Sequence, residues 1–132
     1  MNIIAIDPGL TIGLAYLDAF SGDFKVMQTD SPVLAMEQVK YWRDHYGAYD
    51  IICENYNSAG HLTKEAKETI KIVGLFEYGI SAELVSPQAR LSSVADATLL
   101  AADDVVDMYR KGRDAIAALA HALSFAREHD GR

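Results

Sequence analysis

The N-terminal part of the chain alternates apolar runs with short polar turns. A Pro-Gly pair at residues 8 and 9 separates the first two runs, and FSGD at residues 20–23 separates the second from the third. Both separators are typical of tight turns between adjacent strands. The pattern therefore predicts a meander of three antiparallel strands, over residues 2–7 (NIIAID), 12–18 (IGLAYLD) and 24–29 (FKVMQT).

After the meander, helical and strand patterns alternate. Ser31 and Pro32 have the residue types of a helix cap and a first helical residue, and apolar residues with helical spacing follow as far as Gly47. Residues 50–54 (DIICE) are a short apolar run typical of a central strand buried on both faces. This order predicts a three-layer α/β domain with a mixed sheet. The further elements that we expect are a helix over 62–79, a strand over 82–86, a helical segment after Ser86-Pro87, and helices over 96–109 and 113–129.

The composition agrees with one domain over residues 1–132. Half of the residues are hydrophobic, which is enough for a core, and no linker-like or repetitive stretch divides the chain. No run approaches the ~20 apolar residues of a membrane span, and the N-terminal apolar run lacks the preceding positive charge of a signal peptide. The single cysteine, Cys53, excludes a disulfide framework and zinc sites built on cysteine pairs. We therefore expect a protein of the reducing cytoplasm.

The net charge of the chain is −7, from 12 basic and 19 acidic residues. Such a balance argues against a general nucleic-acid binder, which usually has a basic surface. However, seven of the 12 basic residues lie between Lys64 and Arg113. Because salt screens exposed charges beyond ~10 Å, local charge decides binding more than the total does. The net charge therefore does not exclude a local DNA-binding surface.

Asp7 and Glu54 each end an apolar strand pattern, and a third acid opens the last predicted helix. Asp7 follows IIAI, Glu54 follows IIC, and Asp114 lies in KGRDAIAALAHAL. If the strands bring these carboxylates together, they can bind Mg²⁺, which prefers oxygen ligands. Two such ions ~4 Å apart support phosphodiester hydrolysis. Each acid also has a simpler interpretation: Asp7 as a turn residue, Glu54 at an exposed strand end, and Asp114 as a complement to the helix dipole.

Four stretches resemble the RuvC-type Holliday junction resolvases of the RNase H-like superfamily. IIAIDPGLTIGLAYLD is similar to their first two strands, with an Asp before Pro-Gly, and IICENYNSAG to their second motif, where a Glu ends the fourth strand. KIVGLFEYGISAELVSPQARL and GRDAIAALAHAL resemble the family's helix–strand–helix segment and its closing helix. The matches come in family order and cover nearly the whole chain. The chain is shorter than typical cellular members, as a compact, phage-type version would be.

The resemblance implies an RNase H-like three-layer α/β/α domain with a five-stranded mixed sheet. It implies a homodimer that resolves four-way DNA junctions in the bacterial cytoplasm. The implied reaction is Mg²⁺-dependent phosphodiester hydrolysis by metal-activated water, with Mn²⁺ as an alternative cofactor, and it leaves 5′-phosphate and 3′-hydroxyl ends. Asp7, Glu54 and Asp114 would be both the catalytic residues and the metal ligands.

The chain departs from the family pattern at its fourth metal ligand. The family usually has an Asp or His three residues before the last Asp, where this chain has Lys111, whose ammonium has no lone pair for a cation. Either three acids suffice or another group substitutes. Asp107 is one candidate, although Gly112 is expected to break the helix before Asp114. His121 lies on the same helix face as Asp114, and we interpret it as a residue behind the ligands or on the plain helix surface.

A second departure concerns the aromatic residue that the family often places three residues after the Glu of its second motif. Asn57 occupies that position here, and the aromatic is Tyr56. If the loop shifts by one residue, Tyr56 can stack on a base, a contact worth ~1–3 kcal/mol in single-strand binders. The alternative is an ordinary packed tyrosine.

Basic residues at three places are candidate DNA contacts. Three lysines form a stripe on the predicted helix 62–79, although neighbouring glutamates also fit a solvated face with local ion pairs. The resemblance places further contacts near Arg90, and a basic cluster just before Asp114 can hold phosphates. The apolar face of helix 62–79 suits either the core or a dimer partner. With Tyr56, the candidate DNA-binding residues are Lys64, Lys67, Lys71, Arg90, Lys111 and Arg113.

Three functions remain open from the sequence. The first is a junction resolvase, and the second is another RNase H-like nuclease that acts on branched DNA or RNA–DNA hybrids. The third is a non-catalytic junction-binding module, which Lys111 and the negative charge favour, although retained acids repel one another without a metal. A sugar kinase or ATPase is disfavoured, because the chain lacks paired domains and a Gly-rich phosphate loop.

Overall fold

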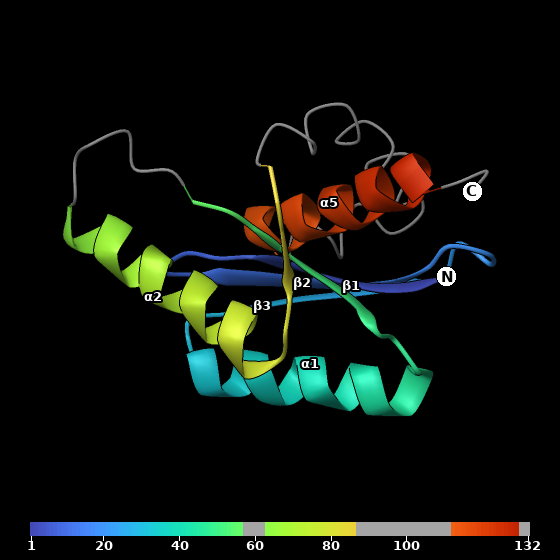
Figure 1. Ribbon diagram of the computed structural model, residues 1–132, viewed down its shortest axis with the longest axis horizontal. Coiled ribbons are helices and arrows are strands. Elements are labelled where there is room, and N and C mark those ends of the chain that lie inside the picture. The colour runs from blue at the N-terminus through green and yellow to red at the C-terminus, as the bar shows by residue number, and fades with distance from the viewer. Residues whose placement is uncertain (57–62, 87–111, 130–132) are drawn as a thin grey trace.

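The computed structural model of the protein describes residues 1–56, 63–86 and 112–129. The helical segments predicted after Ser86-Pro87 and over 96–109 lie outside these residues. Among the described residues, no helix is long and apolar enough to cross a membrane. The elements are β1 (Asn2–Asp7), β2 (Ile12–Asp18), β3 (Phe24–Thr29), α1 (Pro32–Tyr46), β4 (Asp50–Glu54), α2 (Lys64–Gly79), β5 (Glu83–Val85) and α5 (Arg113–His129) (Figure 1).

The strands form one five-stranded sheet in the order β3-β2-β1-β4-β5. β1, β2 and β3 pair antiparallel, which confirms the predicted meander. β4 lies parallel to β1 on one side and to β5 on the other. This mixed sheet is the one that the sequence predicts, and it places apolar β4 in the interior of the sheet, where both faces are covered.

Helices cover the two faces of the sheet in separate layers (Figure 1). On one face, Ile4, Ile6 and Leu14 pack with α1 and α2 in the largest core cluster. On the other face, Ile3 and Ala5 belong to a cluster with residues of α5. Successive residues of β1 thus point to opposite layers. The architecture is the three-layer α/β/α arrangement with a five-stranded mixed sheet that was expected.

The sequence signals for helix ends hold in α1 and α2. Ser31 accepts a hydrogen bond from the Leu34 N–H at 3.2 Å, with Pro32 as the next residue, and α1 ends at Gly47 in a left-handed conformation. Thr63 caps α2 in the same way, so this helix begins at Lys64 rather than at residue 62. Both helices therefore begin at a side chain that satisfies an otherwise unpaired backbone N–H.

Helical spacing predicts an apolar stripe for this helix at Leu62, Ala66, Ile70, Val73 and Phe76, and the buried face of α2 differs from it. Ala66, Val73 and Phe76 are buried as expected, but Thr69 and Ile72 are also buried, and Ile70 is 43% exposed. The buried stripe runs from Ala66 through Thr69 to Phe76, and Ile70 lies beyond its edge. The direction from which the sheet approaches the helix decides this face, and apolarity alone does not.

Candidate functional site

Strand register places two of the predicted acids side by side at one edge of the sheet. Asp7 is the last residue of β1 and pairs with Gly13 of β2. In the parallel pair of β1 and β4, Ile6 is aligned with Cys53. The next residue of each strand is an acid, Asp7 in β1 and Glu54 in β4. Ile3 and Ala5, which share the strand face of Asp7, pack toward α5. Both acids therefore end adjacent strands, and Asp7 belongs to the sheet face that α5 covers.

The third acid reaches this edge because helix α5 begins against β2. A Cβ atom on Gly13 would overlap the backbone carbonyl of Asp114, so the first turn of α5 lies directly on this glycine. Gly13 is also the register partner of Asp7. Gly13 thus lies next to both Asp7 at the end of β1 and the backbone of Asp114 at the start of α5.

Gln28 and Gly112 hold the start of α5, and the sequence indicated only the helix break at Gly112. The Gln28 side chain of β3 accepts a hydrogen bond from the Ala115 N–H at 3.4 Å. Gly112 has φ of +94°, and a Cβ there would overlap the Gln28 side chain. Gly13 had a signal, since a glycine inside a strand often marks a close backbone approach. Gln28 had none, because its partner is remote in sequence.

Glu54 is held by a buried histidine from the middle of α5. The Glu54 Oε2 and His121 Nε2 atoms are 2.9 Å apart. His121 is only 1% exposed, so the interpretation as plain helix surface is wrong, and the residue lies behind Glu54. Asp114 and His121 are two helical turns apart on one face of α5, and that face lies on the sheet.

The carboxylates also act on the thiol of Cys53, which lies beside Glu54 in β4. Burial raises the pKa of Cys53, and the negative charges of Asp7 and Glu54 raise it further. Cys53 packs in the core cluster on the face opposite α5. The thiol is therefore held in its protonated form as part of the core, and a buried thiol of this kind is chemically inert.

The chemistry of the donor set fits a hard divalent cation, since the backbone brings three acidic residues to one edge of the sheet. Asp7 is 7% exposed, so its carboxylate is largely removed from bulk water. Within the part of the chain that the structure describes, however, no three His, Cys, Asp or Glu side chains form a ready-made cation cage. The backbone thus gathers the acids, and a shared ion would require side-chain adjustment.

The predicted DNA-binding residues that the structure describes are exposed. Tyr56 is 40% exposed, two residues beyond Glu54, so it is not an ordinary core tyrosine. Arg113 is exposed at the first residue of α5, beside Asp114. Arg90 and Lys111 lie outside the described residues, as does Asp107. The helix break expected at Gly112 agrees with its positive φ and with the start of α5 at Arg113.

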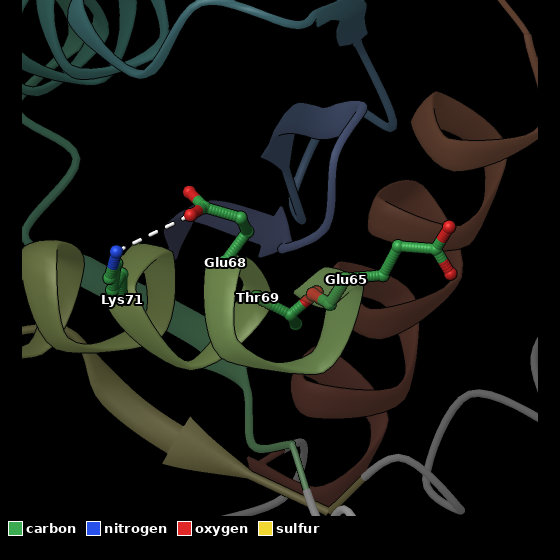
Figure 2. A network of polar contacts seen from close by, with 4 residues as sticks. All are labelled: Glu65, Glu68, Thr69 and Lys71. Atoms are coloured by element: carbon green, nitrogen blue, oxygen red, sulfur yellow. Dashed lines mark hydrogen bonds and ion pairs between the residues drawn. The ribbon is translucent and has the colours of Figure 1, made fainter. Parts of the chain in front are cut away.

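The lysine stripe of α2 is interleaved with acids. Lys64, Lys67 and Lys71 are all exposed. Figure 2 shows Lys71 reaching Glu68, with 3.3 Å between Nζ and Oε1, whereas Glu65 points away from Lys71. The Thr69 hydroxyl instead donates to the Glu65 backbone carbonyl. Local ion pairing is therefore present on this face, and an exposed pair of this kind contributes little to stability.

Comparison with known proteins gives a result at the level of structure. No family model and no curated protein matches the sequence. A structure of T. thermophilus RuvC in complex with a Holliday junction substrate matches with a TM-score of 0.60 and 15% identity, over 98% of this chain and 96% of that one. A second Thermus thermophilus RuvC structure matches with a TM-score of 0.56 and 14% identity, over 97% of this chain and 96% of that one. The chain therefore has the RuvC-type, RNase H-like fold that the order of its motifs predicts.

Proposed function

We propose that the protein is a divalent-cation-dependent endonuclease that resolves four-way DNA junctions by phosphodiester hydrolysis. The observation that carries this proposal is the meeting of Asp7, Glu54 and the start of α5 at one edge of the sheet. That edge belongs to a fold matched over nearly its whole length by RuvC, including a structure with a Holliday junction substrate. Neither the acids nor the fold alone would support a nuclease as strongly.

Asp7, Glu54 and Asp114 are the residues proposed to hold Mg²⁺ or Mn²⁺. The bound cations would activate water and stabilise the leaving oxygen of the cleaved phosphodiester. The chain's own contribution is placement, because strand register fixes Asp7 beside Glu54 and Gly13 lets Asp114 approach them. Lys111, in the position of the family's usual fourth ligand, is proposed to contact a phosphate rather than a metal.

The DNA surface is proposed to surround these acids. Arg113 and Tyr56 are exposed next to Asp114 and Glu54, and they would contact a phosphate and a base, respectively. The lysines of α2 (Lys64, Lys67 and Lys71) and Arg90 would extend the contact along the arms of the junction. Because the overall charge is negative, binding would depend on these local cations and would weaken with added salt.

A second copy of the chain is proposed to complete the enzyme, since symmetric cleavage of a junction needs two sites. Ile70, Leu75 and Tyr78 of α2 are apolar or aromatic and exposed, Tyr78 by 85%. A partner helix would remove this surface from water. Sedimentation equilibrium should give a dimer mass for the wild type and a monomer mass for Tyr78→Glu. A monomeric wild type that still makes paired cuts would contradict this part of the proposal.

A substrate panel tests the proposed function. The protein is incubated with labelled four-way junction, flap, fork and RNA–DNA hybrid of matched arm sequences, in Mg²⁺, Mn²⁺ or EDTA. We expect paired cuts in the junction that need the metal. Preferred cleavage of flaps or hybrids would favour another RNase H-like nuclease, and junction binding without any cleavage would favour a non-catalytic module.

A further inference from the structure

His121 contacts Glu54, one of the proposed metal ligands, from the core of the protein. His121 Nε2 lies 2.9 Å from Glu54 Oε2, and the ring is 1% exposed. The two residues are remote in sequence, because Glu54 ends β4 and His121 lies in the middle of α5. The contact therefore exists only because α5 crosses this face of the sheet.

The second ring nitrogen of His121 indicates which proton the ring carries. Nδ1 is buried and has no hydrogen-bond partner among the described residues. A proton on Nδ1 would be a buried donor without an acceptor, which costs more than leaving a lone pair unfilled. The arrangement therefore favours a proton on Nε2, which then donates to the carboxylate.

Such a hydrogen bond restricts the orientation of a carboxylate. Glu54 has three side-chain torsions and ends a strand, so its carboxylate can in principle adopt several rotamers. A rigid imidazole fixed in the core restricts the position of one oxygen, Oε2. Substitution of residues that orient metal ligands in this way commonly lowers metal affinity, although these residues do not touch the metal.

We propose that His121 is a positioning residue that fixes Glu54 for cation binding, an inference that rests on the proposed function of Glu54 as a metal ligand. Helix α5 then contributes twice to the site, through Asp114 at its start and through His121 two turns later. In a chain with Lys111 where the family has a fourth ligand, fixing Glu54 compensates in part for the missing group. A purely structural role, as a packed core histidine, is the alternative to be excluded.

Mn²⁺ binding to the DNA-free protein tests this role without any cleavage assay. Two substitutions are compared: His121→Gln retains an N–H donor of similar reach, and His121→Met fills the core without a donor. The matched control is His129→Met, on the same helix, where the histidine contacts Phe125. Free Mn²⁺ is measured by electron paramagnetic resonance, and the fold of each metal-free variant is checked by thermal unfolding.

We expect His121→Met to bind Mn²⁺ ~10–100-fold more weakly than the wild type, the usual effect of losing a residue that orients a ligand. His121→Gln should recover most of the affinity, and His129→Met should bind like the wild type. Equal affinity in a folded His121→Met protein would overturn the proposal. If the His121→Met protein does not fold, the test rests on His121→Gln. A folded His121→Gln protein that binds Mn²⁺ much more weakly than the wild type would then overturn the proposal.

Nuclear magnetic resonance of the His121 ring supplies a readout that is independent of metal and DNA. Long-range proton–nitrogen correlations should show a protonated Nε2 and an unprotonated Nδ1, whereas the opposite tautomer would overturn the inference. Failure of the proposed function is distinguishable, because it would appear as a wild type that binds Mn²⁺ and does not cut junctions. The His121 substitutions would still change Mn²⁺ affinity in that case.

Discussion

Gly13 determines how closely helix α5 approaches the sheet. A methyl group at this position would overlap backbone atoms of Asp114, which have no rotamer with which to move away. We expect Gly13→Ala to lower the free energy of unfolding by about 1–3 kcal/mol, as overpacking of a tight contact does. It should also lower Mg²⁺-dependent cleavage, because Asp114 moves with the helix. Urea denaturation and a junction-cleavage assay measure the two effects.

Gly74 provides the matched control for this substitution. It lies inside α2, and a Cβ there would meet no atom within 4 Å outside the helix's own backbone. Gly74→Ala should therefore raise stability by up to ~1 kcal/mol through helix propensity and leave cleavage unchanged. A Gly13→Ala variant as stable and active as Gly74→Ala would contradict the close approach of α5 to β2 at Gly13.

Cys53 gives the protein a predictable response to alkaline pH. Burial and nearby carboxylates raise its pKa in the folded state, whereas the unfolded thiol ionises near ~8.5. Above that pH the unfolded state thus binds fewer protons than the folded state. The contribution of this thiol to stability is fully present below that pH and decreases as the pH rises above it. The expected slope from this thiol is on the order of 1 kcal/mol per pH unit between about pH 8.5 and the onset of tyrosine ionisation near ~10.

Denaturant midpoints of the wild type and Cys53→Ala, measured at about pH 7 and pH 9.5, isolate this effect. Cys53→Ala should be less stable at neutral pH, because it leaves a small cavity, but it should lose less stability on going to alkaline pH. Native wild type should also resist thiol alkylation until it unfolds. A parallel decline of both proteins with pH would show that Cys53 contributes nothing to the response.

At the scale of single residues, the sequence identified acids better than it identified their supports. Asp7 and Glu54 follow apolar strands, and an acid in that place is visible without any structure. The roles of Gln28 and His121 depend on where α5 lies on the sheet, and no local pattern contains that information. His121 was placed on the correct helix face, but its burial against Glu54 could not be deduced from spacing.

Among the elements, α5 is the one whose start matters most to the site. Gly112 precedes it with φ of +94°, a conformation that an L-residue adopts at a cost of on the order of 1–2 kcal/mol. A Cβ at Gly112 would also displace the Gln28 side chain that bonds the Ala115 N–H. We expect Gly112→Ala to lose stability and to reduce cleavage by up to ~100-fold, because a shift of ~1 Å at a catalytic group can cost that much.

Gly47→Ala separates the effect of backbone strain from the effect of disturbing the start of α5. Gly47 ends α1 with φ of +66°, and a Cβ there would contact nothing within 4 Å. This variant should lose a similar amount of stability from backbone strain and keep its full cleavage activity. Thermal unfolding and single-turnover cleavage at saturating Mg²⁺ measure both quantities. Equal cleavage by the Gly112→Ala and Gly47→Ala variants would argue against a role for the start of α5 in the site.

Local patterns predicted the described elements well because their signals are local. Strands β1 to β4 have the predicted bounds, and α1 begins at its cap and proline as expected. β5 is shorter than predicted, and α2 buries Thr69 where Ile70 was expected. These differences arise where tertiary contacts decide, since neither the pairing of an edge strand nor the approach of a sheet to a helix is encoded in hydrophobic spacing.

For the whole molecule, the order of motifs carried more information than the hydrophobic pattern did. The pattern predicted a meander followed by alternating elements, but it could not predict that β4 pairs with β1 rather than with β3. That pairing is non-local, and it is the step that brings Glu54 beside Asp7. The resemblance to RuvC-type resolvases supplied the five-stranded architecture, and the structural comparison confirms the fold.

The central claim is that acids gathered at one edge of this sheet cut DNA junctions. Its most direct test compares the wild type with Asp7→Asn on a labelled four-way junction in Mg²⁺, with binding and cleavage measured separately. We predict paired symmetric cuts by the wild type. Asp7→Asn should bind the junction and lose cleavage by on the order of 10³-fold, because several kcal/mol of charge stabilisation in the transition state is removed. A wild type that binds the junction but never cuts it in Mg²⁺ or Mn²⁺, or an Asp7→Asn variant that cuts as fast as the wild type, would contradict the claim.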